Sequence, residues 1–202
     1  MKIPLIILSF TLLVIDLQAG EFNKKLSVGD AAPQWKDLPG VDGKDHSFDE
    51  WKAKKYLIVV FTCNSCACSV DYEDRIIAFA NKYAAPKTDV ALVAINVNTI
   101  PDDRLNKMKE RAKAKKFPFP YLYDESQQIA RDYGAVYTPE FFLLNAERKI
   151  AYMGSFDDKI NPSDVKVKYL EDALLALQAG KAPPQKETLA KGCLIRFKRV
   201  RD

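Results

Sequence analysis

The sequence predicts an α/β fold, a three-layer sandwich in which helices cover a mixed central sheet. Apolar, β-branched runs typical of buried strands alternate with segments whose apolar residues recur at helical spacing. Two later apolar runs are separated only by a short turn, as in an antiparallel hairpin, and an amphipathic helix follows them. Strands connected through helices run parallel, whereas hairpin strands run antiparallel, so the sheet is expected to contain both kinds of pairing.

Each expected element follows from a local pattern. Residues 28–55 combine turn clusters with short strands. Longer apolar runs follow and predict buried strands, with a shorter apolar segment at 121–123. The strands are expected at 56–62, 90–97, 141–144 and 149–153. Amphipathic or charged stretches between and after the strands predict helices. The helices are expected at 69–83, 102–116, 126–133 and 164–177.

The first twenty residues resemble a secretory signal peptide: a charged start, the apolar run 3–15 and a small-residue exit at Ala19 and Gly20. The apolar run is shorter than the roughly 20 residues of a membrane-spanning helix. We therefore expect residues 1–20 to be cleaved and the protein to be secreted or periplasmic, without stable membrane association afterwards; an uncleaved anchor is the alternative. Residues 21–202 are long enough for one domain, with a basic C-terminal tail.

The charge balance points away from nucleic acid as a partner. The chain has 31 Lys and Arg against 27 Asp and Glu, a formal net charge of +4, and its lysines are scattered. No basic segment is interleaved with aromatic residues in the manner of a nucleic-acid module, and the basic run 196–201 is expected to be a solvated tail.

Three of the four cysteines lie together between the first predicted strand and the first predicted helix, at Cys63, Cys66 and Cys68. Free backbone N–H groups and the partial positive charge at a helix N-terminus lower the pKa of a thiol. Two cysteines three residues apart can also close a disulfide, and an exported protein meets an oxidising compartment. The cluster therefore indicates thiol redox chemistry. Buried apolar thiols or a structural crosslink are the alternative.

The same residues resemble a known family. The segment Phe61-Thr62-Cys63-Asn64-Ser65-Cys66 after a buried strand, with Thr138-Pro139 before a later strand, resembles the thioredoxin fold. More narrowly, the chain is similar to peroxiredoxin-like members of the alkyl hydroperoxide reductase and thiol-specific antioxidant group. The supporting segments span nearly all of the mature chain: 29–33, 42–44, 72–75, 94–96, 121–127, 134–135 and 192–195. The resemblance implies a thioredoxin-like three-layer sandwich with a mixed central sheet.

The resemblance also implies roles for individual residues. In thioredoxins the nucleophilic cysteine stands five residues after the strand phenylalanine, a position held here by Cys66, and its partner position holds Ser69. Cys63, one turn upstream, is the nearest candidate to resolve an intermediate on Cys66. If the family pattern carries over, a cis peptide bond at Thr138-Pro139 presents the preceding backbone to an extended substrate beside the thiolate.

Cys68 and Cys193 are further candidates. Cys68 is two residues from Cys66, and residues two apart on a helix do not face each other. Cys193 could resolve the intermediate on Cys66 or pair with Cys68. Both pairings stay open, because the distance between two cysteines in space cannot be read from the sequence. Either cysteine could instead be structural.

The leading hypothesis is an exported thiol-disulfide oxidoreductase that acts on protein thiols or disulfides with a thiol electron donor and needs no cofactor or metal. A thiol peroxidase is an alternative, although the positions of the peroxiredoxin Thr and Pro hold Cys63 and Val59. A Cu(I)-binding protein is another, since thiolates such as those of Cys63, Cys66 and Cys68 select soft ions. Copper chaperones of this fold usually add a late histidine, and His46 is the only one here. A catalytically idle module with crosslinking cysteines is the last alternative.

Overall fold

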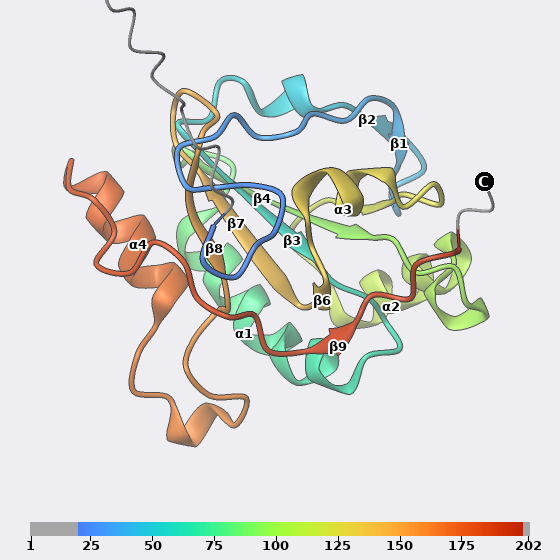
Figure 1. Ribbon diagram of the computed structural model, residues 1–202. Helices are drawn as coiled ribbons and strands as arrows, with labels where there is room; N and C mark the ends of the chain where they lie inside the picture. The colour runs from blue at the N-terminus through green and yellow to red at the C-terminus, as the bar shows by residue number, and fades with distance from the viewer. Residues whose placement is uncertain (1–19, 200–202) are drawn as a thin grey trace, which may run out of the picture.

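A computed structural model describes residues 20–199, which fold around a five-stranded mixed sheet (Figure 1). The strand order is β5-β4-β3-β7-β8. The parallel strands are β3 (Tyr56–Phe61), β4 (Val90–Asn96) and β5 (Tyr121–Tyr123). The antiparallel strands are β7 (Glu140–Leu144) and β8 (Ile150–Gly154). The mixed sheet confirms the predicted α/β fold class, while nearly all of the predicted signal peptide lies outside the described residues.

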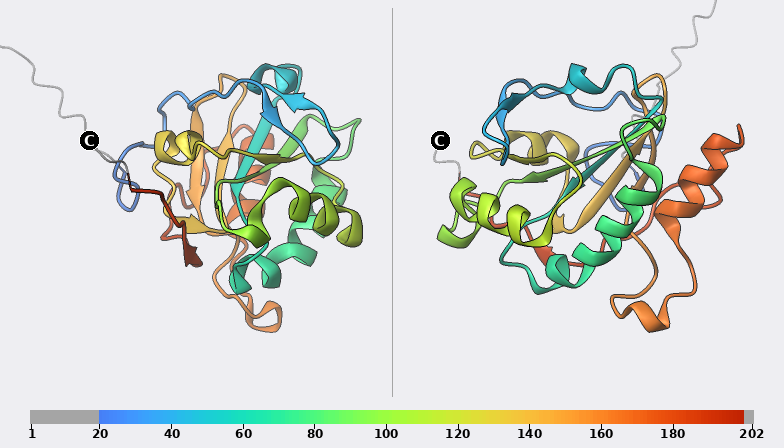
Figure 2. Two further views of the ribbon diagram at one scale, coloured as in Figure 1. Left: turned by 90° about the vertical axis from the view of Figure 1, so that its right-hand side faces the viewer. Right: turned by 180° about the vertical axis from the view of Figure 1, so that it is seen from behind.

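Helices cover both faces of this sheet. One face packs against α1 (Ala67–Tyr83), α2 (Leu105–Lys115) and α4 (Tyr169–Gln178). The opposite face packs against α3 (Gln128–Tyr133) and the N-terminal segment (Figure 2). Alternating side chains of β3 divide between these two cores, because successive residues of a strand point to opposite faces. Every residue of β3 is buried, which explains its uninterrupted apolar sequence.

Short elements complete the chain. They are β1 (Leu38–Pro39), β2 (Asp45–His46), β6 (Tyr137–Thr138), β9 (Cys193–Leu194) and three 3₁₀ turns, η1 (Phe48–Trp51), η2 (Pro101–Asp103) and η3 (Pro162–Asp164). The β1 strand pairs with β2, and β6 pairs antiparallel with β9. The β6–β9 pair brings the C-terminal segment to the strand that precedes Pro139.

All four predicted helices start at a different residue from the sequence prediction, and α3 begins at Gln128, two residues later than predicted. The predicted helix 102–116 is divided, because the extended backbone of Arg104 (φ −73°, ψ 156°) separates η2 from α2. The predicted helix 164–177 begins only at Tyr169, after the η3 turn. The α1 helix begins at Ala67, two residues earlier than predicted, because Cys66 forms its N-cap. In the part of the chain that the structure describes, no helix combines the length and the apolar character needed to cross a membrane.

Candidate active site

Cys66 lies where the chain passes from the end of β3 into α1. It is the N-cap residue of that helix, and its Sγ accepts the backbone N–H of Ser69 at 3.4 Å. The α1 helix is 17 residues long and has no acidic residue in its first turn. No acidic side chain of the first turn therefore offsets the partial positive charge of this N-terminus, which favours a thiolate at Cys66.

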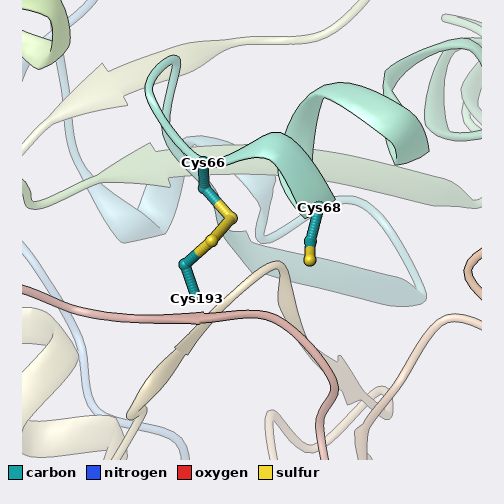
Figure 3. A group of neighbouring side chains, drawn as sticks. All are labelled: Cys66, Cys68 and Cys193. Carbon is teal, nitrogen blue, oxygen red and sulfur yellow. A yellow bond between two sulfur atoms is a disulfide. The ribbon is translucent and has the colours of Figure 1, made fainter.

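The structure bonds Cys66 to Cys193 of β9, 127 residues away along the chain (Figure 3). Their Cα atoms are 5.9 Å apart, within the usual range for a disulfide. The sequence had placed Cys63 as the nearest partner of Cys66, but here Cys63 is a free, buried thiol. Its Sγ lies 3.5 Å from Thr138 Oγ1. The tertiary packing of β9, which sequence spacing does not reveal, therefore decides which sulfur meets Cys66.

Thr138 and Pro139 form the other wall of the site, and the peptide bond between them is cis. The carbonyl oxygen of Thr138 lies 3.1 Å from Cys66 Sγ. Thr138 also pairs with Cys193 of β9 in the β6–β9 ladder. A Cβ at Gly192 would clash with the Thr138 carbonyl, so this close approach requires glycine. The site thus combines the helix N-cap sulfur, a cysteine on an extended strand and the strand before Pro139.

A buried carboxylate holds the cysteine loop in place. Asp103 of η2 is 0% exposed, and its Oδ1 accepts the backbone N–H groups of Asn64 at 2.8 Å and Ser65 at 3.0 Å. Its Oδ2 accepts the Ser65 hydroxyl at 2.6 Å. The buried phenol of Tyr121 donates to Asn64 Oδ1 at 3.2 Å, and burial raises the pKa of this phenol well above its ordinary value, so it stays a donor. Sequence reasoning missed Asp103, because this residue lies in the charged stretch 102–116, which predicts a surface helix.

Glu140, directly after Pro139, is a second buried carboxyl that the sequence analysis missed. It is 6% exposed, and its Oε2 accepts the backbone N–H groups of Val136 and Tyr137, both at 2.9 Å. Burial raises the pKa of Glu140 to about 7, against the lowering effect of these two hydrogen bonds. The one sequence feature that could have drawn attention to Glu140 is its position directly after Thr138-Pro139. An acidic residue at the start of a strand, however, does not indicate that its side chain is buried.

Cys68 lies in the first turn of α1 and is partly exposed. Its Sγ and those of Cys66 and Cys193 all lie within 4.8 Å of one another. Among the described residues, the sulfur cluster is therefore Cys66, Cys68 and Cys193, whereas the sequence alone had grouped Cys63 with Cys66 and Cys68. The catalytic role of each cysteine stays a prediction.

Comparison with known proteins identifies the family of this chain. A model of the Redoxin family matches residues 27–174, well over half of the chain. The chain belongs to the Redoxin family. None of the curated protein sequences matches this redoxin. The narrower resemblance to peroxiredoxins is only distant: a solved peroxidoxin from Mycobacterium tuberculosis is 16% identical, with a TM-score of 0.52 over 62% of this chain and 83% of the other.

Two solved structures cover most of the redoxin. An uncharacterized conserved protein from Geobacillus kaustophilus is 33% identical, with a TM-score of 0.80 over 87% of this chain and 94% of the other. A hypothetical protein from Sinorhizobium meliloti 1021 is also 33% identical, with a TM-score of 0.79 over 87% and 97%. A thiol-disulfide oxidoreductase from Bacteroides fragilis NCTC 9343 has 18% identity and a TM-score of 0.53 over 61% and 89%. The last likeness shows the thioredoxin-like fold alone.

We expect Asp103→Ala to destabilise the redoxin by about 2–3 kcal/mol, because two part-buried backbone N–H groups and the Ser65 hydroxyl lose their buried acceptor. Urea unfolding measures this change. Asp102→Ala is the matched control, since Asp102 is the exposed neighbour in the same turn. Equal stability of the two variants would show that the Asp103 carboxylate does not hold the cysteine loop.

The stability of the redoxin should fall as the pH rises toward about 7, because the folded protein keeps the Glu140 proton longer than the unfolded chain does. This contribution is fully present below about 4.5, the ordinary pKa of Glu, and is lost as the pH passes about 7. Glu140→Gln should remove this slope and raise the free energy of unfolding at pH 8 by at most about 3 kcal/mol.

Urea unfolding at several pH values between 4.5 and 8.5 measures the slope expected for Glu140. Glu147→Gln is the matched control, because Glu147 is exposed in the β7–β8 turn. A slope that persists unchanged in Glu140→Gln would assign the pH dependence to another group.

Proposed function

We propose that this redoxin is a thiol-disulfide oxidoreductase in which Cys66 is the nucleophile and Cys193 resolves the intermediate. One observation carries the proposal: an extended segment bearing a cysteine lies along the strand before Pro139 and is disulfide-bonded to the cysteine at the helix N-terminus. This arrangement has the form of an enzyme joined to an extended polypeptide substrate, with the chain's own β9 in the place of the substrate.

The reaction begins with the reduced protein. The Cys66 thiolate attacks one sulfur of a substrate disulfide, forms a mixed disulfide and expels the other substrate sulfur as a thiolate. The Cys193 thiolate then attacks Cys66 Sγ, which forms the Cys66–Cys193 disulfide and releases the second substrate thiolate. Two electrons pass from the two protein thiols to the substrate, both substrate thiolates take up protons, and an external dithiol donor returns the protein to its reduced state.

The geometry of β9 supports this sequence of steps. Cys66 is 3% exposed in the disulfide form, because β9 lies over it, whereas Cys193 is partly exposed. A donor thiolate therefore reaches Cys193 first, and its attack there expels Cys66 as a thiolate at the helix N-terminus. The β6–β9 ladder contains only two residue pairs. Once the disulfide opens, few backbone hydrogen bonds hold β9 against the edge that a polypeptide substrate would use.

An assay of insulin disulfide reduction with a dithiol donor tests the proposed activity, and hydrogen peroxide consumption with the same donor tests the peroxidase alternative. We expect catalysed reduction of the disulfides and little consumption of peroxide. Fast consumption of peroxide without reduction of insulin disulfides would contradict the proposed activity and support the thiol peroxidase alternative.

We also propose that the protein is exported and that residues 1–20 are its signal peptide, which supports a redox role outside the reducing cytosol. N-terminal sequencing of the protein isolated from its native cells tests this point. A mature chain that begins near Glu21 is the expected result, whereas a chain that retains the apolar run would contradict cleavage.

A further inference from the structure

The sulfur atoms of Cys66, Cys68 and Cys193 form a compact group at the start of α1 (Figure 3). We propose that the reduced protein binds one Cu(I) ion through these three thiolates, so that the Cys66–Cys193 disulfide controls a metal site. The inference deepens the redox proposal and rests on it in one respect, because it requires that this disulfide can be opened.

The distances suit a three-coordinate site. With metal–sulfur bonds of about 2.3 Å, three sulfurs around one ion lie about 4 Å apart. The three sulfurs already lie within 4.8 Å of one another. In the oxidised protein Cys66 and Cys193 are bonded to each other, and only Cys68 is available as a thiolate ligand. Two-electron reduction by a dithiol, which is itself oxidised to a disulfide, converts the bonded pair into two thiols.

The ligand set selects a soft monovalent ion. The group contains sulfur only, and thiolates prefer Cu(I), whereas Zn²⁺ in structural sites is usually held by four protein ligands. The remaining candidates are engaged elsewhere. Cys63 lies against Thr138 Oγ1, and both ring nitrogens of His46 contact carboxylates, at 3.1 Å to Asp42 and 2.8 Å to Glu50. A three-coordinate sulfur site is therefore the arrangement that the described residues offer.

The surroundings favour the charge of such a complex. One Cu(I) ion displaces three thiol protons and leaves a net charge of −2 on the group. The Ser69 N–H directed at Cys66 Sγ and the dipole of α1, without acidic residues in its first turn, stabilise negative charge there. Cys68 and Cys193 are partly exposed, so an ion can enter from solvent, while the buried Cys66 closes the inner side.

A competition titration tests the site. The mature chain is reduced with a phosphine, freed of reductant without oxygen, and titrated with Cu(I) in the presence of the chelator bathocuproine disulfonate. We expect one tightly bound Cu(I) per chain with three sulfur neighbours by X-ray absorption. The oxidised protein and the reduced Cys68→Ser variant should each bind at least about tenfold more weakly. Cys63→Ser is the matched control and should keep the affinity of the wild type.

Two outcomes would overturn the metal site: equal affinity of Cys68→Ser and the wild type, or a loss in Cys63→Ser as large as that in Cys68→Ser. Formation of the Cys66–Cys193 disulfide in oxidised Cys68→Ser checks that this variant is folded. The phosphine opens the disulfide chemically, so the titration does not depend on turnover. A chain that binds Cu(I) through Cys68 but does not reduce insulin would support the metal site and contradict the proposed activity. A chain that reduces insulin but does not bind Cu(I) through Cys68 would support the activity and contradict the metal site.

Discussion

Cys66→Ser is expected to lower the rate of disulfide reduction by roughly three orders of magnitude, because a serine hydroxyl cannot replace a thiolate as the nucleophile. Cys66 is the sulfur at the N-cap of α1, where the Ser69 N–H and the helix dipole stabilise negative charge. The same position predicts that Cys66 is the thiol that iodoacetamide modifies fastest in the reduced protein. The measurements are the initial rate of insulin reduction and mass mapping of the modified cysteines.

Cys63→Ser is the informative comparison for Cys66→Ser. Both cysteines lie on the loop between β3 and α1, but only Cys66 caps the helix and contacts the Thr138 carbonyl. We expect a much smaller effect of Cys63→Ser, since Cys63 is 3% exposed and packed beside Thr138. If Cys66→Ser still reduced disulfides at the wild-type rate, the nucleophile would have to be Cys63 or Cys68.

Cys193→Ser is expected to trap a mixed disulfide on Cys66, because no other sulfur in the described structure is bonded to it. Incubation of the reduced variant with a peptide disulfide should therefore give a stable peptide adduct, which mass spectrometry assigns to Cys66. The wild type should release the peptide and form the internal disulfide. An adduct that accumulates in Cys63→Ser but not in Cys193→Ser would assign the resolving role to Cys63.

The same variant should also lose stability relative to the oxidised wild type. The disulfide closes a loop with a sequence separation of 127, for which the chain-entropy argument gives an upper limit of about 5 kcal/mol, and measured losses are more often about 2–4 kcal/mol. Urea unfolding of both oxidised proteins measures this difference. The reduced wild type is the control, and it should match Cys193→Ser within about 1 kcal/mol if the crosslink alone accounts for the loss.

Local sequence patterns were sufficient to predict most of the sheet. The uninterrupted apolar runs of β3 and β4 indicated strands buried on both faces, and the turn between β7 and β8 indicated a hairpin. Helix ends were harder to place. The α4 helix begins later than predicted because the segment after η3 stays extended, and residue types alone do not show such a choice.

Within the candidate site, local patterns in the sequence placed the cysteine cluster between a strand and a helix and Thr138-Pro139 before a strand, because both features depend on neighbours in the chain. The resemblance to thioredoxins then singled out Cys66 as the cysteine at the helix start. The tertiary structure decided which sulfur meets Cys66. It brings Cys193 to β6 through a two-residue ladder and places Cys63 beside Thr138. It also buries Asp103 under the cysteine loop and Glu140 behind Pro139. Pairing and burial depend on contacts between residues far apart in the chain, and local patterns carry little information about such contacts.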